Sequence, residues 1–150
     1  MANRVEPKLI PALFEEFQSE TFVTISSVDK KSGAPVIHAI SWILAKDEET
    51  LVLSVDQRSR LVENVENNST VTVCLIANES TYAISGEASV EGMLEEVPLK
   101  LSLIKIKINE VRDVMFYGSK MVQAPTYDKT YDKVAAERLD SQVMEAMKKA

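Results

Sequence analysis

A chain of 150 residues with 45% apolar content is long enough to build one hydrophobic core and gives no reason to expect a second domain. Its formal charge of −6 excludes the basic surface that binding to nucleic acid requires. No apolar stretch approaches the roughly 18 residues of a membrane-spanning helix, and the N-terminus lacks the apolar core of a signal peptide. We therefore expect a cytoplasmic protein that binds neither nucleic acid nor membranes.

The first third of the sequence predicts a short helix followed by a β-hairpin. Apolar residues recur at helical spacing over residues 9–17. Runs rich in β-branched residues at 21–28 and 35–44 predict two strands, and the polar turn signal at 29–33 joins them.

The middle of the sequence continues as short strands with one helix between them. A short helix is expected at 59–67, and Gly86 predicts a bulge or a close approach of two backbones. Further strands are expected at 51–55, 70–76, 82–91 and 99–108. Six short strands with few helices predict a mainly β fold, a small antiparallel barrel with flanking helices.

Cys74 is the only cysteine, so the chain can form no internal disulfide. Because it lies in an apolar run, we expect a buried free thiol, which suits a reducing cytoplasm.

The last forty residues, 111–150, are predicted to form an arm and a terminal helix. We expect them to belong to the same single domain, 1–150. Residues 111–132 contain Gly118, Pro125 and three tyrosines and show no regular period, whereas apolar residues spaced four or five apart predict a helix beyond them. A loop of this length is uncommon in a compact monomer. We expect the segment 111–150 to pack on a partner subunit, where its tyrosines would cover a surface.

The loop that follows the third predicted strand carries the strongest functional signal. Arg58 and Arg60 flank Ser59 where the strand ends and a helix begins. Two guanidinium groups, a hydroxyl and the N–H groups of a helix N-terminus suit a phosphate group. The alternative is that these arginines are ordinary surface residues paired with Glu63 or Asp56.

Three segments follow one another in an order and spacing typical of a known family. They are FVTISSVDKKSGAPVIHAISW, LVLSVDQRSRLVENVENNSTVTVCL and YAISGEASVEG. They resemble the opening hairpin, the strand with its phosphate loop and helix, and the fifth strand of the pyridoxamine 5'-phosphate oxidase-like family of FMN-binding split barrels. The resemblance covers residues 22–91. It implies a six-stranded antiparallel split β-barrel that binds FMN at a homodimer interface.

The resemblance also implies which residues bind the cofactor. Ser59 and Arg60 fall where the family holds the FMN phosphate, and Arg58 would assist them. The strand end beneath the flavin corresponds to Ser54, Val55 and Asp56. The strand along the isoalloxazine ring corresponds to His38, Ala39, Ile40, Ser41 and Trp42. Thr81 corresponds to a position that approaches the flavin from the second subunit.

Two departures from the family pattern limit what the resemblance implies. Leu61 stands where the family often has a lysine that reaches the phosphate, so affinity for FMN would be reduced. The tail, FYGSKMVQAPTYDKTYDK, lacks the arginine and tryptophan pattern with which true pyridoxamine phosphate oxidases hold their substrate. Oxidation of pyridoxamine phosphate is therefore not expected.

The sequence leaves several functional hypotheses open. The leading one is an FMN-dependent oxidoreductase or flavin reductase acting on an unidentified small molecule, with no catalytic side chain and no metal ligand of its own. The alternative is a non-catalytic module of the same fold that binds flavin, haem or deazaflavin, or that serves a stress response. His38 is the sole histidine and a candidate haem ligand, but a packed or surface role is the commoner one. Trp42 is likewise more typical of core packing than of a flavin platform.

Overall fold

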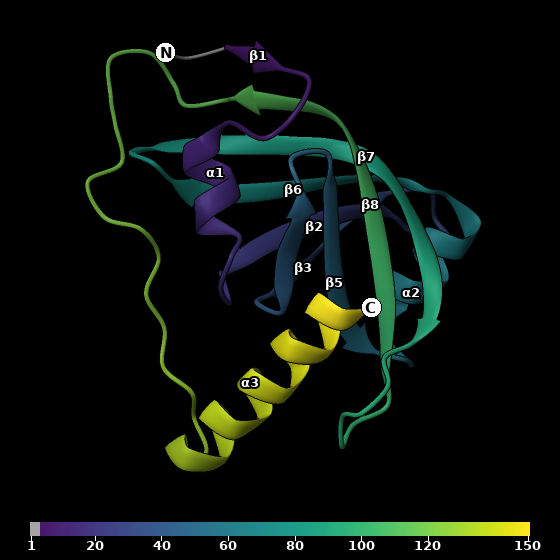
Figure 1. Cartoon of the computed structure of the whole chain (residues 1–150). Coiled ribbons are helices and arrows are strands. Elements are labelled where there is room, and N and C mark those ends of the chain that lie inside the picture. Colours follow the sequence, from purple (N-terminus) through teal and green to yellow (C-terminus); the bar gives the residue numbers. More distant parts are fainter. Residues whose placement is uncertain (1–3) are drawn as a thin grey trace.

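The computed structural model describes residues 4–150, which form one strongly curved β-sheet flanked by three helices (Figure 1). In chain order the elements are β1 (Val5–Glu6), α1 (Pro11–Glu16), β2 (Val23–Val28), β3 (Pro35–Ile40), β4 (Ile43–Asp47), β5 (Thr50–Asp56), α2 (Arg60–Asn67), β6 (Thr70–Ala77), β7 (Ser80–Met93), β8 (Leu101–Asp113) and α3 (Lys133–Lys149).

The sheet is antiparallel throughout and has the order β3-β2-β6-β7-β8-β5-β4, with β1 added beside β8. β3 and β4 follow one another in the chain but lie at opposite ends of this order. The two-residue corner of Ser41 and Trp42 joins them, so the sheet must curl until its ends meet. This arrangement confirms the predicted split barrel.

The number of strands differs from the prediction, because the eight-stranded sheet has two strands more than expected. The run 35–44 is not one strand: it bends at the corner, where the backbone N–H of Ile43 donates to the Ser41 carbonyl at 3.0 Å. β4 continues to Asp47, three residues beyond the predicted end of the strand at 44. β1 has only two residues, too few to give a periodic pattern.

The barrel interior is filled by alternate residues of the strands together with one face of α1 and of α2. In β2 every second residue is buried, and the same alternation continues in β6. Leu61 and Val65 of α2 and Phe17 beyond α1 complete this cluster. Each fully buried side chain of this size contributes about 1.5–3 kcal/mol.

Cys74 does not belong to that interior. It is half-buried and lies on the opposite face of β6 from Val73 and Leu75, which point into the barrel. The prediction of a buried thiol is wrong because the apolar run is a strand with two unlike faces.

A second apolar cluster lies outside the barrel, between α3 and the strands β4, β5 and β8. Val143 and Met147 of α3 are fully buried there against Leu44 and Val52. Lys46 fixes the end of the helix, because its Nζ donates to the carbonyl oxygens of the last turn at 2.7–3.1 Å. The terminal helix therefore packs on the barrel of its own chain; whether it also packs on a partner subunit stays a prediction.

The arm is shorter than predicted, because β8 continues to Asp113. From 114 to 132 the described chain forms no helix or strand and runs along the outside of the barrel (Figure 1). It is attached at its start by Val114, whose N–H donates to the Thr81 carbonyl at 2.8 Å. Near its end the Tyr127 ring meets Phe22, with centroids 6.1 Å apart.

Gly86 marks a point where two backbones approach closely, as predicted. A Cβ at this position would lie 2.3 Å from the Lys107 carbonyl oxygen of β8, and the pairing register of β7 and β8 shifts between Ser85 and Gly86. Only glycine fits there without displacement of a strand.

Within the described residues, none of the helices combines the length and the apolar character needed to cross a membrane.

Candidate functional site

The loop between β5 and α2 is a tight turn in which Ser59 starts the helix. The Ser59 hydroxyl accepts a hydrogen bond from the Leu61 N–H at 3.2 Å, and the Ser59 N–H donates to the Asp56 carbonyl at 2.8 Å. A serine in this position satisfies one of the N–H groups that the first turn of a helix leaves without a partner. The sequence predicted this helix start correctly, but the hydroxyl is already engaged within the loop.

Arg60 is paired with Asp29 and not with Glu63 or Asp56, the partners predicted for a surface arginine in this loop. Its Nε and Nη2 lie 2.7 Å and 2.6 Å from Asp29 Oδ1 in the β2–β3 turn. The Asp29 side chain is 9% exposed, whereas that of Arg60 is 56% exposed. The Ser32 backbone N–H and the Arg60 guanidinium lower the pKa of Asp29 to about 2. The buried carboxylate lies behind the guanidinium, and the positive group faces solvent.

Arg58 is paired more loosely, as the surface alternative anticipated. Its Nε lies 3.2 Å from Asp56 Oδ1, and both side chains are mostly exposed. The Arg58 side chain and its backbone N–H lower the pKa of Asp56 through hydrogen bonds. An exposed pair only two residues apart can exchange partners readily.

Asn64 makes a second connection between α2 and the β2–β3 hairpin. It is fully buried, its Oδ1 accepts from the Lys30 N–H at 3.0 Å, and its Nδ2 donates to the Ser27 hydroxyl at 3.1 Å. Asn64 was not among the predicted site residues, although an asparagine on the buried face of a helix is unusual and needs partners.

Leu61 lies in the barrel interior with no exposed surface. It packs there as part of the core cluster, so this position contributes no charge to the loop. With Asp29 and Asp56 beside Arg58 and Arg60, the charges of these four side chains sum to zero.

His38 faces the barrel interior from β3. It lies directly opposite Ile25 of β2, and its Nδ1 is buried with no hydrogen-bond partner in the part of the chain that the structure describes. Burial, and then the positive charge of Arg60, lower the pKa of His38. The imidazole therefore favours its neutral form and lies within the electrostatic reach of the loop.

β3 itself is an edge strand, which pairs only with β2 among the described strands. Its second row of backbone N–H and C=O groups is therefore open to another partner. Ala39 and Ile37 point outward and are exposed, whereas Ile40 packs against the interior cluster.

The corner that follows β3 is held by a cluster of charged groups. Lys129 Nζ lies 2.7 Å from Glu20 Oε2 and 3.2 Å from Asp140 Oδ1, and all three side chains are largely buried. Ser41 donates its hydroxyl hydrogen bond to Glu20, and Trp42 Nε1 donates to Asp140 at 2.9 Å. Both predicted ring-binding residues are thus tied to the arm and to α3, a connection that no local sequence pattern could indicate.

The residues at the end of β5 that were predicted to lie beneath the flavin do not all point to the same face of the strand. Val55 packs against the barrel interior, while Ser54 shares the outer face with Val52, which contacts α3. The Ser54 hydroxyl is buried and has no hydrogen-bond partner among residues 4–150.

Thr81 is not brought to the loop within one chain. It lies in the β6–β7 hairpin, opposite Ile76, and its hydroxyl is 3.7 Å from Met115 Sδ. This hairpin is at the far end of β6 from α2, roughly 20 Å away at the rise of a strand. Its predicted role in the second subunit stays a prediction.

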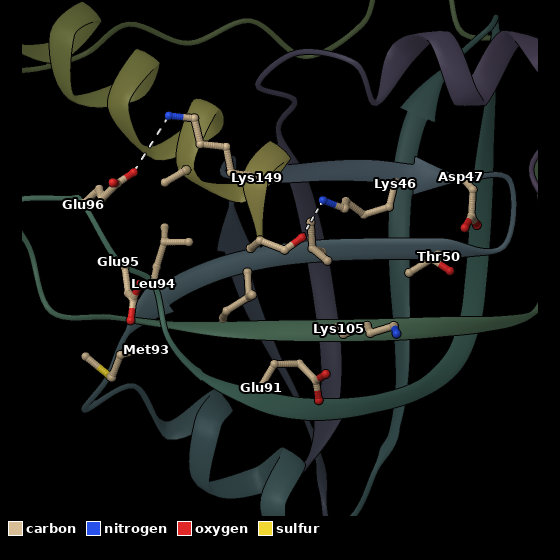
Figure 2. A pocket seen from close by; sticks show the side chains of 14 residues that line it. Lys46, Asp47, Thr50, Glu91, Met93, Leu94, Glu95, Glu96, Lys105 and Lys149 are labelled. Carbon is tan, nitrogen blue, oxygen red and sulfur yellow. Dashed lines mark hydrogen bonds and ion pairs between the residues drawn. The ribbon is translucent and has the colours of Figure 1, made fainter.

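The outer face of the barrel carries a cavity of about 700 Å³ between α3 and the strands β4, β5, β7 and β8 (Figure 2). Three lysines, three glutamates and an aspartate are among its lining residues, and Lys149 reaches Glu96 across its rim at 3.8 Å. None of the predicted site residues lines it. Residues 4–150 also contain no group of three or more histidine, cysteine, aspartate or glutamate side chains placed to hold a metal ion.

The loop and the β3 edge together fit a phosphate ester attached to a planar polar ring. Arg60 uses two of its five N–H donors on Asp29, so three remain for an anion. The open edge of β3 offers backbone hydrogen-bonding groups, and β3 follows the turn that holds Asp29 beside that guanidinium. FMN has both parts, and the groups present here suit it.

The sequence pattern that describes pyridoxamine 5'-phosphate oxidase matches residues 9–115. A search of curated proteins finds no match. Among solved structures, a candidate pyridoxamine 5'-phosphate oxidase from Lactobacillus delbrueckii is similar with a TM-score of 0.62 at 18% identity, over 74% of this chain and 98% of that chain.

Two further structures show the same likeness. General Stress Protein 26 from Bacillus anthracis has a TM-score of 0.53 at 19% identity, over 68% of this chain and 98% of its own. An F420 reductase has a TM-score of 0.51 at 15% identity, over 63% of this chain and 91% of its own. At such identities the likeness establishes the fold alone.

Proposed function

The chain belongs to the pyridoxamine 5'-phosphate oxidase family, and on this premise we propose that it binds FMN between the β5–α2 loop and the edge of β3. The observation that carries the proposal is the outward-facing guanidinium of Arg60, fixed at the start of α2 beside Ser59. A charge-assisted bond from a fixed guanidinium suits the phosphate of FMN.

The ring would lie along β3. Backbone groups of the open strand edge are the chain's own means of orienting a polar ring there. A bound flavin supplies transfer of electrons or hydride at its ring, so the protein needs no acid or base of its own for that step. We propose an oxidoreductase or flavin reductase acting on a small molecule other than pyridoxamine phosphate.

A homodimer in a reducing cytoplasm belongs to the same proposal. Phe116 and Tyr117 of the arm are exposed apolar side chains, and such residues gather at subunit interfaces. Thr81, which lies far from its own loop, would reach the flavin of the partner subunit. The single free thiol of Cys74 suits a reducing compartment.

The test is retention and affinity of FMN. Purified protein is mixed with excess FMN and desalted, and absorbance bands at about 375 and 450 nm are expected to remain. The Arg60→Ala variant should bind FMN roughly 10- to 100-fold more weakly, because it loses a charge-assisted hydrogen bond to the phosphate. The matched control is Arg4→Ala, which removes another arginine from an exposed ion pair, with Glu6.

A wild-type protein without bands and without a thermal shift in FMN would overturn the proposal. Two other absorbance results would favour the alternative hypotheses about the cofactor. Retention of F420 in place of FMN would favour a deazaflavin-binding protein. F420 is the cofactor in the name of one structural neighbour. A Soret band that disappears in His38→Ala would indicate haem.

A further inference from the structure

The carboxylate of Asp29 is fixed by the turn in which it lies. Its Oδ2 accepts hydrogen bonds from the backbone N–H groups of Ser32 at 2.9 Å and Lys31 at 3.2 Å. The backbone of Asp29 is bonded in the same turn, with its N–H to the Ala34 carbonyl at 2.8 Å and its carbonyl to the Gly33 N–H at 2.9 Å. Backbone donors keep this carboxylate in place whatever Arg60 does.

The other oxygen of the same carboxylate faces Arg60. Oδ1 accepts from both Nε and Nη2, a contact that fixes the plane of the guanidinium as well as its position. The buried Asn64 joins the same helix to the same turn. The first turn of α2 and the β2–β3 turn therefore behave as one rigid unit that presents the free donors of Arg60 to solvent.

We infer that Asp29 is a positioning residue for the phosphate site: its buried carboxylate holds the Arg60 guanidinium in the orientation in which its remaining N–H groups meet a ligand phosphate. The inference rests on the proposed function. Asp29 acts through Arg60 and touches no ligand itself.

Whether Asp29 strengthens or weakens the binding of a phosphate depends on two opposing contributions. An arginine side chain loses rotamer freedom when it is fixed, and Asp29 has already removed that freedom before a ligand arrives. The carboxylate also repels a phosphate, but it lies behind the guanidinium and is neutralised by it. We expect the orienting effect to be the larger one, as preorganisation generally favours binding.

Arg58 has no buried carboxylate to hold its guanidinium in one orientation. Its partner Asp56 is exposed, and the Arg58 side chain is 85% exposed. Because Asp56 and Arg58 are themselves predicted to lie at the cofactor, the matched control is Glu110, a partly exposed carboxylate that pairs with Arg112 at 3.1 Å outside the predicted site.

The experiment compares Asp29→Asn with Glu110→Gln in full-length protein. Dissociation constants are measured for FMN and for riboflavin, which has the ring but no phosphate, and their ratio cancels general damage to the fold. Asp29→Asn should reduce the preference for FMN by about fivefold or more, and Glu110→Gln by less than about twofold. An unchanged or increased preference in Asp29→Asn would overturn the inference.

A second variant applies if Asp29→Asn does not fold. Arg60→Lys keeps the charge but lacks the Nε–H and the planar fork that Asp29 holds. A preference for FMN equal to that of the wild type would show that charge alone suffices and that orientation by Asp29 is unnecessary. A loss of about fivefold supports the inference.

Failure of the proposed function would be recognised separately, because the wild type would then bind neither flavin. Positioning is in that case read from the NMR signal of the Arg60 Nε–H during titration with inorganic phosphate. A phosphate-dependent shift in the wild type that is absent from Asp29→Asn supports positioning for an anion. A signal that does not respond in either protein, or responds equally in both, overturns it.

Discussion

Two ion clusters join segments that are distant in the sequence, and they are built in opposite ways. At the start of α2, a single buried carboxylate, Asp29, is held by backbone N–H groups and faces a half-exposed arginine. At the β3–β4 corner, a single lysine, Lys129, lies between two largely buried carboxylates.

The difference separates a cluster suited to a ligand from one suited to structure. Asp29 keeps its backbone donors if Arg60 turns away, so the arginine can share its charge with another anion. Glu20 and Asp140 rely on Lys129, and they also hold Ser41 and Trp42. Loss of that lysine would leave two negative charges close together with no cation between them.

The largest expected effect is therefore at the corner. Lys129→Met should lower the free energy of unfolding by about 2–3 kcal/mol, somewhat less than the loss from a fully buried pair. Urea denaturation measures it. Lys120→Met is the matched control, because it removes an exposed ion pair with Glu79 from the same arm and should change little. Equal effects of the two variants would contradict the assignment of Lys129 as a structural group.

A smaller effect is expected when one acceptor of the corner cluster loses its donor. Trp42→Phe removes the Nε1–H that donates to Asp140 but keeps an aromatic ring in the second apolar cluster. The expected loss is about 1 kcal/mol of unfolding free energy, the usual value of such a bond. Stability equal to that of the wild type would show that the indole hydrogen bond contributes nothing.

The ion pair of Asp29 and Arg60 should make the stability of the protein depend on pH in the acidic range. The pKa of Asp29 is about 2 in the folded protein, against an ordinary value of 3.8. Because folding favours the ionised form, this stabilisation is complete above pH about 4 and is lost as the pH falls towards 2. The midpoint of urea unfolding between pH 5 and 2 should therefore fall more steeply in the wild type than in Asp29→Asn. Parallel curves for the two proteins would contradict the low pKa.

The smallest effect is expected at the exposed pair of the same loop. Arg58→Ala removes a guanidinium that is paired only with an exposed carboxylate two residues away. No measurable change in the midpoint of urea unfolding is expected. A clear destabilisation would mean that Arg58 has a structural partner of the kind that Arg60 has in Asp29.

Local patterns predicted much of this fold. Ser59 indicated the start of α2, the turn signal at 29–33 indicated the β2–β3 hairpin, and Gly86 indicated the close approach of β7 and β8, because each depends on neighbouring residues. The bend at Ser41 was missed because no glycine or proline marks it and apolar residues continue on both sides.

The candidate site was harder to predict than the elements that carry it. The sequence placed Arg60 in the loop, but its partner Asp29 lies 31 residues earlier, and Lys129 is 109 residues from Glu20. Pairs of this kind depend on the curvature of the whole sheet rather than on any local period. The burial of Leu61 explains why no charge is available at that position: its place on the inner face of α2 makes it part of the core.

The long ribbon of β7 and β8 has a consequence for how the chain folds and opens. It joins two wings, with β6, β2 and β3 attached through β7, and β5 and β4 attached through β8. Its strands of 14 and 13 residues are connected by a short loop, so they pair at a low cost in loop-closure entropy. Either wing can open while the ribbon survives, but loss of the ribbon separates them. Its amide protons therefore report global unfolding, whereas those of β3 report only local opening of an edge.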